Sequence, residues 1–112
     1  MKLIIAGGRD FSDLAFMRTI VDSYETIDEI VSGCARGADR LGERVAGEMN
    51  IPIRLVPAEW HKFGKQAGPI RNRIMAKYAD ELLVFWDGDS IGTQNMMMTM
   101  RRLDKPLTII RY

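Results

Sequence analysis

Four short stretches of this 112-residue chain combine glycine with arginine, carboxylates and hydroxyls, which are the residue types that hold phosphate groups. The stretches are "AGGRD" at 6–10, "SGCARGAD" at 32–39, "GKQAGPIRN" at 64–72 and "WDGDSIGT" at 86–93. Glycine lets a ligand approach backbone amides, and the guanidinium group of arginine donates paired hydrogen bonds to phosphate oxygens. Serine and threonine hydroxyls add further donors. Together the four stretches suit a nucleotide or a sugar phosphate.

The candidate ligand-binding residues come from these stretches and from one tryptophan. They are Gly7, Gly8, Arg9, Asp10, Gly33, Ala35, Arg36, Gly37, Asp39, Trp60, Gly68, Arg71, Asn72, Asp87, Gly88, Ser90, Gly92 and Thr93. The aspartates would repel a bare phosphate, so we expect them to bind ribose hydroxyls or the donor edge of a base, or to orient the arginines. The indole rings of Trp60 and Trp86 can stack on a base.

The pattern of apolar residues indicates how these stretches are positioned. Strands are expected at 2–7, 27–33, 51–58, 80–86 and 106–112. Helices are expected at 12–24, 37–49, 69–78 and 90–104, and Ser12 is the expected N-cap of the first helix. The segment 59–68 is expected to be a loop. This alternation predicts an α/β, Rossmann-like three-layer sandwich: a five-stranded parallel sheet with helices on both faces. Each of the four stretches follows a strand, so all lie at one edge of the sheet, where ligands bind beside the reversal of strand order.

Composition limits the other possibilities. The hydrophobic share of 46% and charged share of 28% suit one globular domain over residues 1–112. A net charge of +1 makes nucleic-acid binding possible but does not favour it, and no apolar run is long enough to indicate a membrane partner. The start "MKLIIAGG" indicates a strand rather than a signal peptide. Cys34, the single cysteine, fits a cytoplasmic protein, and we expect neither a metal nor a cofactor.

Each stretch also has a purely structural explanation when it is taken alone. The Asp87-Gly88 pair is a common turn sequence, Asp39 can serve its own helix N-terminus, and Arg71 can lie on a solvated helix face. Their coincidence on one sheet edge favours a site. We therefore expect Arg71→Ala to weaken ligand binding while leaving folding nearly intact.

The segments "GGRDF", "SGCARGADRLGERVA", "PAEWHKFGKQAGPIRNRIMAKYAD" and "FWDGDSIGTQNM" resemble, in order, the YspA/YpsA-related branch of the SLOG superfamily. The resemblance implies a Rossmann-like fold that binds nucleotides or their derivatives in bacteria and their phages. SLOG enzymes of the phosphoribohydrolase type carry a Pro-Gly-Gly-x-Gly-Thr loop followed by a glutamate that acts on ribose. Here Gly88, Gly92 and Thr93 match that loop, whereas Gln94 and Asn95 stand where the acid is wanted.

Three functions remain open at this point. The preferred one is a binding protein, acting as receptor, sink or processing protein for a nucleotide-like small molecule. The second is an N-glycoside hydrolase acting on nucleoside monophosphates or NAD, with Asp39, Glu59 and Asp87 as catalytic candidates. The third is an accessory protein for single-stranded nucleic acid, with "HKFGK" and "RNR" as its basic flank. The run "MMMTM" at 96–100 offers more apolar side chains than one sheet face needs, which favours a homo-oligomer.

Overall fold

The structure is a computed structural model that describes all residues from 1 to 112. Its strands are β1 (Lys2–Gly7), β2 (Glu29–Ser32), β3 (Ile53–Leu55), β4 (Glu81–Trp86) and β5 (Leu107–Arg111). Its helices are α1 (Leu14–Asp22), α2 (Ala38–Glu48), α3 (Trp60–Phe63), the 3₁₀ turn η1 (Gly64–Gln66), α4 (Ala67–Tyr78) and α5 (Ile91–Arg102). Strands and helices alternate from β1 to β5, as the sequence predicts.

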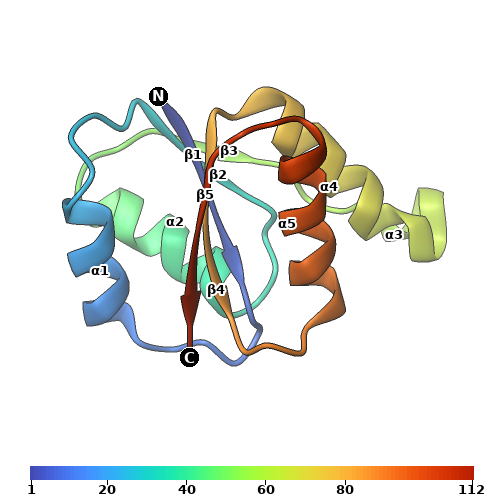
Figure 1. Cartoon of the computed structure of the whole chain (residues 1–112), viewed down its shortest axis with the longest axis horizontal. Helices are drawn as coiled ribbons and strands as arrows, with labels where there is room; N and C mark the ends of the chain where they lie inside the picture. The colour runs from blue at the N-terminus through green and yellow to red at the C-terminus, as the bar shows by residue number, and fades with distance from the viewer.

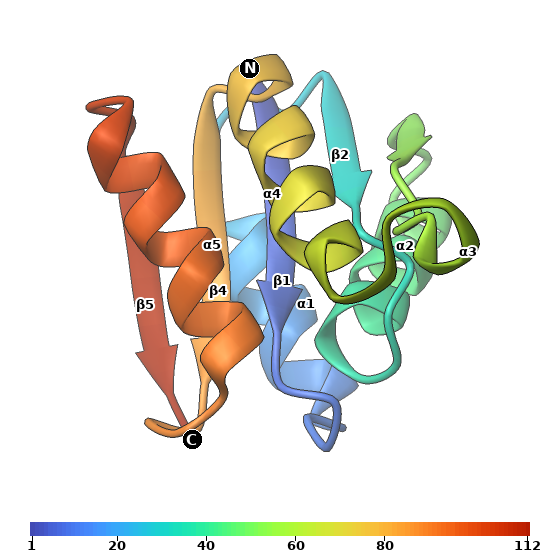
Figure 2. The same ribbon diagram turned by 90° about the vertical axis from the view of Figure 1, so that its right-hand side faces the viewer.

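All five strands are parallel and lie in the order β3-β2-β1-β4-β5. The chain moves outward from β1 to β3 and then crosses to the other side of β1 to form β4 and β5 (Figure 2). The strand order therefore reverses between β1 and β4. At such a reversal the loops that leave the two strands turn to opposite faces of the sheet, which opens a crevice at their carboxyl ends.

The sheet is covered on both faces, so the expected three-layer sandwich is confirmed (Figure 1). Helices α1 and α2 pack on one face, where the strands contribute Leu3, Ile5, Ile30, Leu83 and Phe85. Helices α4 and α5 pack on the other face, against Ile4, Ala6, Val31, Leu82 and Val84. Neighbouring residues of a strand face opposite sides, so a strand buried on both faces is apolar throughout its length.

Two local expectations need correction. Asp13, not Ser12, caps α1, because its Oδ1 accepts a hydrogen bond from the Phe16 backbone N–H at 3.1 Å. The segment expected as a loop contains α3 and η1, which project from the end of α4 (Figure 1).

The loops at the carboxyl edge are tied to one another by backbone hydrogen bonds. The Gly8 N–H donates to the Phe85 carbonyl at 3.0 Å, which joins the loop after β1 to β4. The Gly8 carbonyl accepts from the Ala38 N–H at 3.1 Å, which joins the same loop to the start of α2. These bonds fix the stretches 6–10 and 32–39 relative to each other and to the end of β4, which leads into the stretch 86–93.

Candidate functional site

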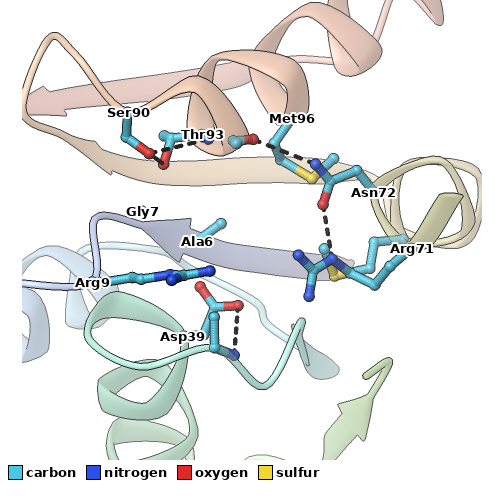
Figure 3. A pocket seen from close by; sticks show the side chains of 12 residues that line it. Ala6, Gly7, Arg9, Asp39, Arg71, Asn72, Ser90, Thr93 and Met96 are labelled. Carbon is cyan, nitrogen blue, oxygen red and sulfur yellow. Dashed lines mark hydrogen bonds between the residues drawn. The ribbon is translucent and has the colours of Figure 1, made fainter. Parts of the chain in front are cut away.

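A cavity of about 90 Å³ lies at the carboxyl end of β1, beside the reversal of strand order. Side chains from four different segments of the chain meet around it (Figure 3). It is lined by Ala6, Gly7, Arg9, Ala35, Asp39, Arg71, Asn72, Met75, Ser90, Gly92, Thr93 and Met96. The structure thus brings nine of the sequence-predicted residues to one place, with Ala6, Met75 and Met96 as additional apolar lining.

Two arginines enter this cavity from opposite sides (Figure 3). Arg71, from α4, is fixed in place: its Nη1 donates to the Gly33 carbonyl at 2.6 Å and its Nε donates to Asn72 Oδ1 at 2.9 Å. Burial lowers the pKa of Arg71 below its usual value. Arg9, from the loop after β1, has no hydrogen bond or ion pair with the protein. Its charge is therefore free to bind an anion.

Asn72 extends the support of Arg71 to the neighbouring helix. Its side chain is 4% exposed, and its Nδ2 donates to Asn95 Oδ1 at 2.9 Å. The chain of contacts from Asn95 through Asn72 to Arg71 links α5 to α4 and then to the loop after β2. Such a connected network fixes the direction of the guanidinium group, as a preorganised anion site requires.

Asp39 is the carboxylate of the cavity. It lies in the first turn of α2 and is only 5% exposed, and its Oδ2 accepts a hydrogen bond from the Ala35 N–H at 3.3 Å. Burial raises the pKa of Asp39 to about 6, although the Ala35 N–H and the Arg71 charge oppose the shift. A carboxylate that titrates close to neutral pH inside a cleft marks a candidate functional group.

The N-terminus of α5 supplies the uncharged donors. Ser90 caps the helix through its side chain, and its Oγ lies 3.0 Å from Thr93 Oγ1. The first two amides of the helix, those of Ile91 and Gly92, have no hydrogen-bond acceptor within the protein. A Cβ at Gly92 would meet no neighbouring group within 4 Å, so the space beside that amide is open. Free N–H groups at a helix N-terminus attract anions.

A second cavity, of about 400 Å³, adjoins the first and shares Arg9, Ala35 and Arg71 with it. Its volume is within the range of small-molecule sites. Trp60, from α3, is 53% exposed and forms part of its wall. The complete lining is Arg9, Gly33, Cys34, Ala35, Arg36, Arg40, Pro57, Ala58, Trp60 and Arg71. Four of these residues, Cys34, Arg40, Pro57 and Ala58, were not predicted from the sequence. For Arg40 the available signal was its position beside Asp39 in the first turn of α2.

Some predicted residues lie outside both cavities and make contacts within the protein. The carboxylate of Asp10 accepts a hydrogen bond from the Tyr112 hydroxyl. Asp87 Oδ1 accepts from the Asp89 and Ser90 N–H groups at 2.8 and 2.9 Å, and these bonds lower the pKa of Asp87. Asp87 therefore fixes the turn that presents Ser90 to the first cavity.

The remaining predicted residues lie along the carboxyl edge of the sheet and line neither cavity. Gly8 and Gly37 lie where their two loops are in backbone contact, and Gly88 lies beside the Arg111 guanidinium. Gly68 lies beside the Trp60 ring, and Glu59 immediately precedes α3. No group of three or more His, Cys, Asp or Glu residues is arranged to hold a metal ion. None of the helices has the length and hydropathy needed to cross a bilayer.

A doubly wound parallel sheet with an arginine-lined crevice at its strand-order reversal defines a Rossmann-like α/β domain. The chain belongs to the YspA, cpYpsA-related SLOG family, whose model matches residues 1–63. It is similar to the Gene 61 protein of Mycobacterium phage D29, with 37% identity over 84 residues, covering 70% of this chain and 67% of the phage protein. These comparisons confirm the family that the sequence motifs indicate.

Among solved structures, the fold is similar to that of DNA processing protein A from Streptococcus pneumoniae. The TM-score is 0.81 at 17% sequence identity, and the similarity covers 99% of this chain. The chain corresponds to only 50% of the length of the pneumococcal protein. At this level of identity the similarity supports the fold.

Proposed function

We propose that this protein binds a nucleotide or nucleotide-derived phosphate ligand in the crevice at the carboxyl edge of its sheet. The observation that carries the proposal is the unpaired guanidinium of Arg9 facing the fixed guanidinium of Arg71, next to the free amide of Gly92. Two arginines and a helix N-terminus around one cavity form a site for a phosphate group.

We place the rest of the ligand according to the chemistry of the remaining lining residues. A phosphate lies between Arg9, Arg71 and the start of α5, with the hydroxyl groups of Ser90 and Thr93 as further donors. Asp39 accepts a hydrogen bond from a ribose hydroxyl, since an ionised carboxylate beside a phosphate is favourable only where a hydroxyl separates the two. The base enters the second cavity and stacks on Trp60.

The first test is to identify what the protein carries. The purified protein is denatured and the released small molecules are analysed by mass spectrometry, and the stripped protein is titrated with AMP by calorimetry. Arg9→Gln should lower the affinity for AMP at least tenfold, because it removes a charge that only the ligand uses, and the melting temperature should not change. Arg101→Gln, which removes the same charge from the last turn of α5, is the control. Equal effects of the two variants would reject the site.

An enzymatic alternative follows from Asp39. Its pKa of about 6 allows the carboxylate to accept a proton from water, as hydrolysis of an N-glycosidic bond requires. Incubation with nucleoside monophosphates and with NAD would release free base under this alternative, and Asp39→Asn would abolish the release. A stoichiometric ligand without turnover supports the binding protein instead.

A third possibility is single-stranded nucleic acid, since the solved structure with a similar fold is named a DNA processing protein. The net charge of +1 provides little electrostatic attraction for a polyanion, so we favour the small ligand. Strong, salt-sensitive retention of single-stranded oligonucleotides would reverse this preference.

We also propose that the protein acts in the cytoplasm as a homodimer. Ile74 of α4 and Met98 of α5 are 53% and 43% exposed, on the helix layer that is opposite α1 and α2. Light scattering at micromolar concentration should give the mass of two chains, and Ile74→Glu should give the mass of one. A monomeric mass for the unchanged protein would rule out the dimer.

A further inference from the structure

The second cavity is lined by positively charged side chains without any negatively charged ones. Four arginines line it, and no aspartate or glutamate does so. Two of them, Arg9 and Arg71, also line the first cavity, where Asp39 partly balances their charge. The other two, Arg36 and Arg40, line the second cavity and not the first. A ligand with a single phosphate in the first cavity would leave these two charges facing an uncharged base or sugar.

Arg36 and Arg40 differ in whether a carboxylate of the protein already neutralises their charge. Arg36 has no hydrogen bond or ion pair with the protein and is exposed. Arg40 pairs with Glu43 through an Nη1 to Oε1 contact of 2.9 Å, and the Arg40 side chain is 57% exposed. Arg36 is therefore the main anion donor of this cavity, and Arg40 contributes from its edge.

The loop that carries Arg36 is held in a defined shape. Cys34 has a φ of 66°, which is an uncommon backbone conformation for a residue other than glycine. The Cys34 N–H donates to Ser32 Oγ at 3.1 Å, and the Ala35 N–H donates to Asp39 Oδ2 at 3.3 Å. Hydrogen bonds on both sides of a strained residue fix the loop, and strain maintained in this way is often found at ligand sites.

We infer that the ligand carries two separated phosphate groups, one in each cavity, as in a nucleoside 3′,5′-bisphosphate or a 5′-phosphorylated dinucleotide. This inference rests on the proposed nucleotide-binding function and specifies its ligand class. The first phosphate contacts Arg9, Arg71 and the start of α5. The second contacts Arg36 and, at the edge, Arg40. The sugar or base between the two phosphates passes the wall that the cavities share at Ala35.

Three adenine nucleotides test the spacing by calorimetry at constant ionic strength. AMP has one phosphate, ADP has two adjacent phosphates, and adenosine 3′,5′-bisphosphate has two that are separated. The bisphosphate should bind at least tenfold more tightly than AMP and more tightly than ADP. The dinucleotide pApA should bind at least as tightly as the bisphosphate if the natural ligand is a dinucleotide, and less tightly if it is a bisphosphate.

The variant Arg36→Gln should reduce the affinity for the bisphosphate at least tenfold and should lower the affinity for AMP by much less. The control Arg44→Gln removes an exposed charge from α2 outside both cavities and should change neither affinity. Equal binding of AMP and the bisphosphate, with no effect of Arg36→Gln, would overturn the inference while leaving the proposed function intact. Tenfold tighter binding of a single-stranded decanucleotide than of pApA would overturn it in favour of nucleic acid. Failure of every nucleotide to bind would instead reject the proposed function itself.

Discussion

Arg71 donates a hydrogen bond of 2.6 Å from its Nη1 to the backbone carbonyl of Gly33, and thereby joins α4 to the loop after β2. The two residues are also in close packing contact, since a Cβ at Gly33 would lie 2.7 Å from Nη1. The same guanidinium lines both cavities. Arg71 thus both holds the loop after β2 and lines the candidate site, whereas Arg9 lines the candidate site without supporting the fold.

This dual role changes the expected effect of removing Arg71. Arg71→Gln should lower the free energy of unfolding by about 1–3 kcal/mol, because the buried Gly33 carbonyl loses its charged donor. It should also lower the affinity for AMP at least tenfold. Urea unfolding and calorimetry measure the two effects, and Arg9→Gln is the comparison that loses affinity alone. Full stability of Arg71→Gln would mean that water replaces the guanidinium at the carbonyl.

The fold was predictable from the sequence because its signals are local. Apolar runs such as 81–86, followed by capping residues such as Ser90, determine each element separately. The parallel arrangement then follows from the alternation of strands and helices. The short helix α3 was missed, since four residues around Trp60 and Phe63 are too few to show helical periodicity.

The site was predictable only in part, for a related reason. Its location follows from topology, so the grouping of Arg9, Arg71 and Thr93 could be anticipated. The division into two cavities could not, because it depends on side-chain directions that no spacing rule gives. For the same reason the sequence could not show that Asp87 accepts hydrogen bonds within its own turn while Asp39 lines the first cavity.

Asp39 should make the stability of the protein depend on pH. Its pKa is raised by burial from 3.8 to about 6, so the folded protein binds more protons than the unfolded chain between these values. Stability therefore falls as the pH rises from about 4 to about 6 and stays low above that window. Asp39→Asn should remove this fall and, near pH 7.5, raise the free energy of unfolding by up to about 3 kcal/mol.

The measurement is urea unfolding of both proteins at a series of pH values, together with AMP binding. The two proteins should be equally stable near pH 4, and the variant should bind AMP more weakly because an amide is a poorer acceptor for a ribose hydroxyl. A variant that is less stable at every pH would show that the carboxylate is needed for the bond to the Ala35 N–H and the attraction to Arg71.

Cys34 should reveal the strain in the loop that carries Arg36. Its φ of 66° is readily adopted by glycine and costs about 1 kcal/mol or more for other residues. Cys34→Gly should therefore be more stable than Cys34→Ala by about 1 kcal/mol, since both variants lack the thiol and differ only at the Cβ. Thermal unfolding of the pair measures the difference. Equal stability would mean that the loop relaxes to a negative φ when the thiol is removed.

A substitution at Gly92 should change ligand binding without destabilising the fold. A Cβ at this position meets no neighbouring group within 4 Å and lies in the first turn of α5, so Gly92→Ala should preserve or raise the melting temperature. The new methyl group would stand beside the free amides that we assign to the phosphate, and the affinity for AMP should fall at least tenfold. Gly47→Ala is the matched control, because Gly47 lies in α2 with equally open space at its Cβ. It should gain similar stability and bind AMP normally; an equal affinity of Gly92→Ala would show that the phosphate does not rest on the start of α5.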